Sequence, residues 1–330
     1  MVPRAGVKAP TVQHRVEYLA IRGIVSILSL LPFRAGSQVG AWLGVLAYRL
    51  GLRARVVETQ IANAFPSLAA AQVKVLARES YVNLGRTSLE AALIARRSRE
   101  ELLALFEQVD GWEHIDAALQ AGRGALVISG HLGNWELGGM YIAARGAPMD
   151  AIARHMSNRI FERYLTGVRE RHGLRIVFDE DAVRQTPRSV RENRVVGFLS
   201  DQGVQGLAST FVPFFGRPAK TPRGPAVFAL RLDVPVVFVA MPRLPSGRYR
   251  LIVEPIVVPR SGDRDADSNA MVAEYTARLE HWVRQYPGQY FWQHRRWKYQ
   301  PPGAPPLPAG MWAARQCRAW AQPSSAARCR

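Results

Sequence analysis

Cysteine is nearly absent: of 330 residues only Cys317 and Cys329 are cysteines, and both lie close to the carboxyl end. Neither the number nor the spacing of these cysteines supports a disulfide framework or a structural zinc site. The histidines also lack the spacing of metal ligands, and we predict no metal and no other cofactor. A G-x-S-x-G motif is missing as well, so the sequence does not indicate an activated serine nucleophile.

Lysine is scarce too, and the net charge of +18 is carried almost entirely by arginine. The few lysines are Lys8, Lys74, Lys220 and Lys298. A charge of this size favours an anionic partner: nucleic acid, an anionic membrane surface, a phosphorylated substrate or an acidic carrier protein. Arginine suits phosphate recognition because its planar fork binds two oxygens at once. Codon bias is the alternative source of the arginine excess.

The apolar segment near the amino terminus, residues 18–31, is short for a membrane span. Fourteen helical residues cover roughly 21 Å, whereas the hydrocarbon core of a bilayer is about 30 Å thick. Polar residues recur along it at helical intervals, namely Arg15, Arg22, Ser26 and Ser29. We therefore predict a helix that lies in the membrane interface, with residues 39–50 extending the same surface. A secretory signal and a buried core helix remain open as alternatives.

From Gly124 onward, apolar segments of strand length alternate with helical stretches, whereas residues 51–99 are helical in pattern. The predicted strands are 125–129, 149–154, 174–178, 195–200, 234–240 and 249–258, with helices at 160–172 and 225–232. This alternation predicts an α/β fold with a central, mostly parallel sheet flanked by helices. We divide the chain into a membrane-associating segment (1–50), an α/β domain (51–300) and a proline-rich, poorly ordered tail (301–330).

The stretch 128–139, ISGHLGNWELGG, brings His131 and Glu136 to the end of a predicted strand. Residues five apart lie off a common helix face, so the two side chains meet only across a turn, for which Gly130 and Gly133 supply permissive backbone. A histidine paired with a carboxylate is the usual general base at neutral pH. The structural alternative is a histidine that caps a helix beside a satisfied glutamate.

Two further polar residues, Arg154 and Asp201, stand at the ends of other predicted strands. Ligands of open α/β sheets gather beyond the carboxyl ends of the strands. We therefore expect His131, Arg154 and Asp201 to share one edge of the sheet.

Several motifs, in this order, resemble the bacterial lipid A biosynthesis acyltransferases. They are RARVVETQIANAFPS, GRTSLE, HLGNWE, the segment that begins SDQGVQG, and QYFWQHRRWK. The resemblance covers about residues 20–300 and implies a late acyltransferase that adds a secondary acyl chain to a lipid A precursor. The same superfamily includes mycobacterial phosphatidylinositol mannoside acyltransferases and, more distantly, glycerolipid acyltransferases with an aspartate in place of Glu136.

The resemblance implies that His131 is the catalytic base and Glu136 its acidic partner. The residues that it implies for substrate binding are Arg154, Arg169 or Arg171, Asp201 and Gln202. The chemistry of acyl transfer adds a need for donors to an oxyanion, and Asn134 or the backbone N–H groups of the glycine-rich turn are the candidates. A second acidic residue, common in the family two positions after the aspartate, is replaced here by Gly203. That difference leaves the roles of Asp201 and Gln202 open.

The implied reaction takes an acyl chain from acyl carrier protein or acyl-CoA to a phosphorylated glycolipid, at the cytoplasmic face of the inner membrane. The run at 290–299, YFWQHRRWKY, is typical of an interfacial belt, with a packed carboxyl-terminal strand or helix as its alternative. A phosphatidylinositol mannoside or glycerolipid acyltransferase is the competing enzyme. A non-catalytic nucleic-acid-binding protein is more remote, because no nucleic-acid-binding motif is present and we expect no nucleic acid partner.

Overall fold

The structure is a computed structural model that describes residues 11–203 and 206–303. Within these ranges the chain begins with helices: α1 (Val12–Leu28), α2 (Phe33–Arg49), α3 (Ala54–Ala64) and α4 (Ala70–Leu93), followed by η1 (Ile94–Arg96) and α5 (Arg99–Leu103). The predicted tail at 301–330 lies outside the described residues except for its first three positions.

A seven-stranded sheet forms the centre of the described residues, in the order β1-β9-β8-β2-β5-β3-β4. Its strands are β1 (Phe106–Asp110), β2 (Ala125–Gly133), β3 (Met149–Ala153), β4 (Leu174–Phe178), β5 (Val195–Leu199), β8 (Val236–Met241) and β9 (Tyr249–Ile256). From β8 to β4 the strands are parallel, β9 is antiparallel to β8, and β1 is parallel to β9. The predicted mostly parallel sheet is confirmed, and all six predicted strands are present.

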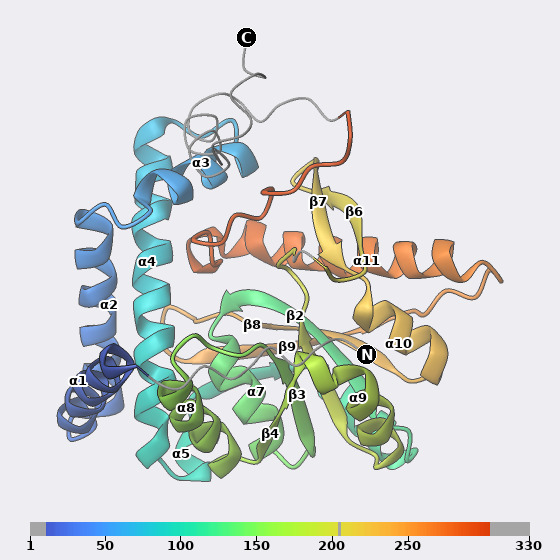
Figure 1. Ribbon diagram of the computed structural model, residues 1–330, viewed down its shortest axis with the longest axis horizontal. Coiled ribbons are helices and arrows are strands. Elements are labelled where there is room, and N and C mark those ends of the chain that lie inside the picture. The colour runs from blue at the N-terminus through green and yellow to red at the C-terminus, as the bar shows by residue number, and fades with distance from the viewer. Residues whose placement is uncertain (1–10, 204–205, 304–330) are drawn as a thin grey trace.

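Helices cover both faces of this sheet (Figure 1). They are α6 (Glu113–Gln120), α7 (Trp135–Ala144), α8 (Arg159–Arg171), α9 (Ala182–Arg191), α10 (Gly224–Leu232) and α11 (Arg264–Gln285), with the short turns η2 (Asp179–Asp181) and η3 (Pro287–Gln289). The sheet has a hydrophobic core on each face, and neighbouring residues of β2 belong to different cores. Ile128 packs in the core on the α11 side, whereas Val127 packs in the core on the α7 side. Strands buried on both faces explain why the sequence shows continuous apolar runs.

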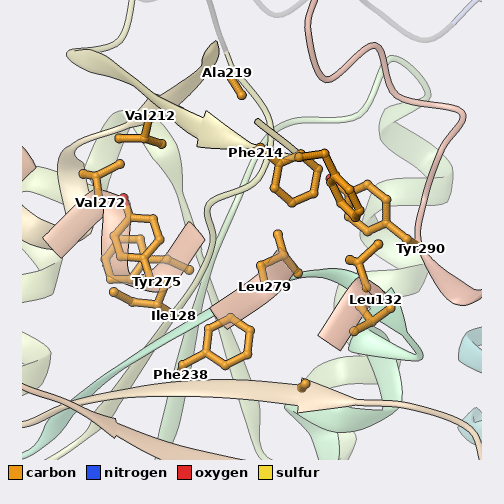
Figure 2. Close-up of a cluster of buried hydrophobic side chains, with 14 of the residues drawn as sticks. Ile128, Leu132, Val212, Phe214, Ala219, Phe238, Val272, Tyr275, Leu279 and Tyr290 are labelled. Atoms are coloured by element: carbon orange, nitrogen blue, oxygen red, sulfur yellow. The ribbon is translucent and has the colours of Figure 1, made fainter. Parts of the chain in front are cut away.

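The core on the α11 side is closed by a hairpin that the sequence pattern missed, β6 (Ser209–Phe214) and β7 (Arg217–Pro222). Figure 2 shows Phe214 of this hairpin beside Tyr290, above Leu279 of α11. The hairpin contains Pro213, Pro218 and Pro222, and proline inside an apolar run argues against a strand.

Helix α1 turns its apolar side chains outward. Val16, Leu19 and Ile27 are all at least 60% exposed, and Val25 is the helix residue that is buried. The inward face is largely polar: Arg22 lies over the ring of Tyr164 at 4.4 Å, and Glu17 accepts from Asn158 at 3.1 Å. The alternative of a buried core helix is therefore wrong.

Helix α2 packs tightly along α4 through glycines. A Cβ at Gly40 or Gly44 would overlap the backbone of Gly85 or Tyr81 on α4, so these positions exclude any side chain. The spacing of four residues places them on one face, as in close-packed helix pairs. The opposite face of α2 exposes Trp42, Leu43 and Leu46. Within residues 11–203 and 206–303, no helix combines the length and the hydropathy needed to cross a bilayer.

The aromatic and basic run at 290–299 is folded into the molecule. Tyr290, Trp292, Arg296 and Trp297 are buried, and Arg296 donates to the carbonyl of Lys220 at 2.7 Å. The prediction of an interfacial belt is wrong for these side chains. They are packed inside the protein, as the alternative expected, but they form neither a strand nor a helix. The backbone of this run is irregular. The buried side chains of Trp292, Trp297 and Arg296 hold it in place, rather than the regular backbone hydrogen bonds of a strand.

Candidate active site

Two neighbouring parallel strands bring His131 and Asp201 together. Ser129 of β2 pairs with Leu199 of β5, and the N–H of Ser200 donates to the carbonyl of Ser129 at 2.9 Å. His131 and Asp201 each follow two residues later, so both stand at the carboxyl edge of the sheet. The expectation that they share this edge is confirmed.

Asp201 holds His131 through both carboxylate oxygens. Its Oδ1 lies 2.7 Å from Nδ1 of the imidazole, and its Oδ2 accepts from the backbone N–H of His131 at 3.0 Å. Burial raises the pKa of Asp201, but the charge and hydrogen bonds of His131, with the charge of Arg296, hold that pKa well below its usual range. Asp201 is therefore a fixed negative charge beside the ring.

A carboxylate at Nδ1 places the imidazole proton on that nitrogen and leaves Nε2 as the basic atom. The amide nitrogen of Gln202 lies 3.4 Å from Nε2, over the same ring. Trp135 and Phe291 flank the imidazole, with ring centroids 4.9 Å and 5.7 Å away. The His131 side chain keeps 16% of its surface exposed, so the imidazole remains accessible from solvent.

The structure differs from the sequence prediction at Glu136. Its carboxylate forms a bidentate pair with Arg169 of α8, at 2.8 Å and 2.9 Å, while the hydrogen bond to the His131 ring comes from Asp201. Burial raises the pKa of Glu136, but Arg169 outweighs it and, with the charge of His131 and the indole of Trp135, holds that pKa below its usual range. Glu136 is thus a second charged neighbour of the imidazole.

Asn134 points away from the exposed edge of the imidazole. It is fully buried and caps α7, because its Oδ1 accepts from the N–H of Leu137 at 3.1 Å. Its amide donates to Glu90 at 2.6 Å and to the hydroxyl of Tyr249 at 3.1 Å. The predicted contact of Asn134 with substrate or oxyanion does not fit this geometry, because the whole amide is engaged inside the protein.

The turn between β2 and α7 depends on Gly133. Its φ of +67° suits glycine, and a Cβ would overlap the carbonyl of Met241. The carbonyl of Gly133 accepts from Asn83 at 2.9 Å and from Thr87 at 3.1 Å, both on α4. The other predicted turn residue, Gly130, has no positive φ; its Cβ would meet Leu279. Helix α4 therefore fixes the chain just after the base.

A buried ionic network backs this turn. Glu90 of α4 is fully buried and pairs with Arg243 at 2.7 Å. It also accepts from Asn134, Ser37 and the hydroxyl of Tyr249. Glu90 and Asn134 lie in the motifs GRTSLE and HLGNWE, but no sequence pattern indicates that they meet, because the members of the cluster are far apart along the chain.

The other predicted arginines make their contacts away from His131 and Asp201. Arg154 follows β3 as expected and is 60% exposed, with Asp179 as its partner at 3.0 Å. Arg171 is exposed and donates to the carbonyl of Ala95. The residue in the place of the family's second acid, Gly203, lies against the backbone of Lys220, so a side chain there would collide.

Comparisons with known proteins agree with these motifs. A sequence profile described as bacterial lipid A biosynthesis acyltransferase matches residues 8–299. The lipid A biosynthesis lauroyltransferase of Escherichia coli K12 is 25% identical over 286 residues, which cover 86% of this chain and 92% of that protein. The palmitoleoyltransferase of the same organism is 25% identical over 85% of this chain and 90% of its own. A phosphatidylinositol mannoside acyltransferase of Mycobacterium tuberculosis H37Rv is 29% identical over 37% of this chain and 40% of its own.

Proposed function

Because the chain belongs to the bacterial lipid A biosynthesis acyltransferase family, whose members are enzymes that transfer acyl groups, we propose that it moves a fatty acyl chain from an acyl thioester to a hydroxyl of a lipid A precursor or a related glycolipid. The observation that carries the proposal is the imidazole of His131, held at Nδ1 by Asp201 and accessible on its other side.

In the proposed reaction, Nε2 of His131 takes the proton of the acceptor hydroxyl, and the oxygen attacks the thioester carbonyl carbon. The C–S bond then breaks, and the proton passes from the imidazolium to the departing thiolate. The ester and a free thiol are the products. Asp201 stabilises the imidazolium as it forms, and such base catalysis is worth about 10²–10⁴-fold in rate.

The oxygen of the tetrahedral intermediate needs hydrogen-bond donors. The backbone N–H of His131 donates to Asp201 and that of Asn134 to Met241. The side-chain amide of Gln202, beside Nε2, is the donor that we propose instead. Glu136 adds negative charge near the imidazole while Arg169 keeps it in place, so we propose a supporting role for Glu136 in the dyad.

The donor proposed is acyl carrier protein or acyl-CoA, and the acceptor is a phosphorylated glycolipid. Both substrates carry phosphate, and arginine binds phosphate through two parallel hydrogen bonds. Arg154 and Arg171 are exposed, and we propose them as the phosphate contacts. Arg169 is already paired with Glu136.

We propose that the enzyme works at the cytoplasmic face of the inner membrane. The outward apolar face of α1, with Leu19 and Ile27, supports an interfacial anchor of the kind predicted from the sequence. The inward, largely polar face of α1 contacts the α/β domain through Arg22 and Glu17, so the proposed anchor lies beside that domain.

A phosphatidylinositol mannoside acceptor is the second candidate, favoured by the mycobacterial relative. The chemistry at His131 would be the same, and only the acceptor would differ. The nucleic-acid-binding alternative has no support from the family to which the chain belongs.

The test is transfer by the purified full chain, with acyl carrier protein or CoA thioesters as donors and with a lipid A precursor or a phosphatidylinositol mannoside as acceptor. Mass spectrometry should show a gain of one acyl chain on one acceptor, and His131→Ala should abolish it while the circular dichroism spectrum stays unchanged. Turnover by His131→Ala within a few-fold of wild type would remove His131 from the chemistry.

A further inference from the structure

A groove of about 760 Å³ runs between α2 and α4, in a part of the molecule that the proposed reaction does not use. Its apolar lining includes Val39, Trp42 and Leu46 of α2 and Val82 of α4. We call it the α2–α4 groove. Figure 1 shows α2 standing beside α4 at one edge of the molecule, with α1 at the lower end of α2.

The charged side chains that line the α2–α4 groove are all basic. Arg49, Arg78 and Arg86 line it, and none of its described lining residues is acidic. Within the described part of the chain, none of these arginines forms an ion pair with a carboxylate. Arg86 donates to Gln38 at 3.1 Å, while its Nε atom is buried with no hydrogen-bond partner. Unpaired cations around an apolar groove match a ligand with one acidic head and one apolar chain.

From these features we infer that the α2–α4 groove binds an anionic phospholipid of the membrane. The phosphate contacts Arg49 and Arg78, and an acyl chain lies along Val39, Trp42 and Leu46. This lipid is a resident of the bilayer, distinct from the acceptor of the reaction.

A lipid fits the α2–α4 groove better than a soluble acidic protein does, because apolar surface continues beyond it. Trp42 is 71% exposed, and Leu50 and Leu52 next to the groove are more than half exposed. The outward apolar face of α1 precedes α2 by a four-residue connection. A bilayer covers such a surface, whereas a charged water-soluble partner leaves it wet.

The test compares two double variants with equal loss of charge. Arg49→Gln/Arg78→Gln removes the proposed phosphate contacts, and Arg188→Gln/Arg191→Gln removes two exposed arginines of α9. Sedimentation with vesicles of phosphatidylcholine and phosphatidylglycerol, free of any acyl acceptor, measures binding. We expect Arg49→Gln/Arg78→Gln to weaken binding by about fivefold for each arginine removed, and the control pair to weaken it much less.

A second readout places the acyl chain. Phospholipids brominated on the chain should quench tryptophan emission of the wild type, and Trp42→Phe should lose most of that quenching. Trp282→Phe, a tryptophan of α11, is the matched control and should keep it. Undiminished quenching in Trp42→Phe would overturn the acyl-chain part of the inference.

The inference rests on the proposed membrane association, and the outcomes separate the two. If the wild-type protein does not bind the vesicles, both the proposed membrane association and the proposed lipid site are overturned. Wild-type binding that both double variants weaken equally, or that neither weakens, overturns the groove alone. If inorganic phosphate displaces the protein from vesicles when its concentration equals that of the anionic lipid, the α2–α4 groove is a site for free phosphate. Acyl carrier protein that binds the wild type but not Arg49→Gln/Arg78→Gln, with vesicle binding unchanged, would assign the groove to an acidic protein.

Discussion

The carboxylate of Asp201 meets Nδ1 of His131 at 2.7 Å, so Asp201→Asn replaces a fixed charge by an amide that is able to turn its NH₂ toward the ring. That change favours the wrong tautomer and removes the charge that stabilises the imidazolium. We expect kcat to fall by about 10²–10⁴-fold with little change in acceptor KM. Steady-state kinetics over a range of acceptor concentrations measures both quantities.

Glu136→Gln tests the other carboxylate near the base. Its partner is Arg169, so we expect a smaller loss of kcat than in Asp201→Asn, and Glu136→Asp should retain partial activity. An equal loss of kcat in Glu136→Gln would show that Glu136 acts on the imidazole as directly as Asp201 does. A rise in acceptor KM with kcat unchanged would instead make Glu136 a binding residue.

His294 gives the protein a pH-dependent stability. Burial lowers the pKa of His294 from 6.5 to about 4, so between these values the unfolded chain takes up a proton that the folded chain does not. Stability therefore falls as the pH falls from 6.5 toward 4, by about 3 kcal/mol over the whole interval. We expect His294→Asn to flatten the dependence of the free energy of unfolding on pH.

The measurement is urea unfolding at several pH values between 7 and 5. Asp201 and Glu136 do not contribute to the slope in this pH range. Their pKa values are lowered in the folded protein, so both carboxyl groups are largely ionised in the folded and in the unfolded state from pH 5 to pH 7. His281→Asn, at an exposed position of α11, is the control and should keep the wild-type slope. An unchanged slope in His294→Asn would show that His294 does not cause the dependence.

At the scale of elements, Glu90 joins α4 to the turn that follows β2. Glu90→Gln keeps the shape but leaves the guanidinium of Arg243 buried without a charge partner. Breaking a buried pair in this way costs about 3–5 kcal/mol. We expect a lower free energy of unfolding and, because Asn134 loses a charged acceptor, a lower kcat measured at a temperature where the variant is fully folded.

The control for Glu90→Gln is Glu274→Gln, which breaks a half-exposed pair with Arg278 within α11. Pairs of that kind contribute about 0.3–0.5 kcal/mol. If Glu90→Gln destabilises the protein but leaves kcat unchanged, the network supports the fold without positioning the turn.

The sequence located both His131 and Asp201, because each follows an apolar run directly. It paired His131 with Glu136 since those residues are close along the chain. The actual neighbour comes from strand order, in which β5 inserts between β2 and β3. Strand order depends on how crossover helices pack, and no local pattern encodes it.

The remaining misses concern β1, the β6–β7 hairpin and the run at 290–299, and their causes differ. The sequence of β1, FEQVD, shows no clear alternation of apolar and polar residues, so it does not indicate a strand. The β6–β7 hairpin was missed because it contains prolines. The run at 290–299 is rich in arginine and tryptophan, which resembles an interfacial belt, yet Arg296 finds buried acceptors in Lys220 and Thr221. Burial of a charge depends on partners that lie far away in the sequence.

For the whole molecule, the arginine excess divides into two groups. Some arginines neutralise buried carboxylates, as Arg175 and Arg194 do for Asp150. Others, including Arg49 and Arg78, have no carboxylate partner within the described residues. Part of the charge that the sequence displays is therefore structural, and part is available to an anionic surface.

A prediction at this scale concerns the outward face of α1. Leu19→Glu/Ile27→Glu places two charges on side chains that are more than two-thirds exposed, so the fold should be unaffected. We expect much of the protein to leave sedimented membranes while activity on detergent-dispersed acceptor is kept. Fractionation of cells followed by an activity assay measures both.

Val183→Glu/Val257→Glu is the matched control, because these valines are at least as exposed as Leu19 and Ile27 but lie outside α1. It should sediment with membranes as the wild type does. Unchanged sedimentation of Leu19→Glu/Ile27→Glu would move the anchor to another surface, such as the exposed face of α2.

The distance along the chain between the members of the site also sets an order of events during synthesis. Asp201 leaves the ribosome 70 residues after His131, which takes roughly 4–14 s at bacterial rates of about 5–20 residues per second, and Phe291 emerges later still. Helices α1 and α2, with their outward apolar side chains, are complete long before. If the proposed reaction and anchor hold, a growing chain reaches a membrane while His131 still lacks its carboxylate partner, and we expect any chain released before Asp201 is made to be inactive.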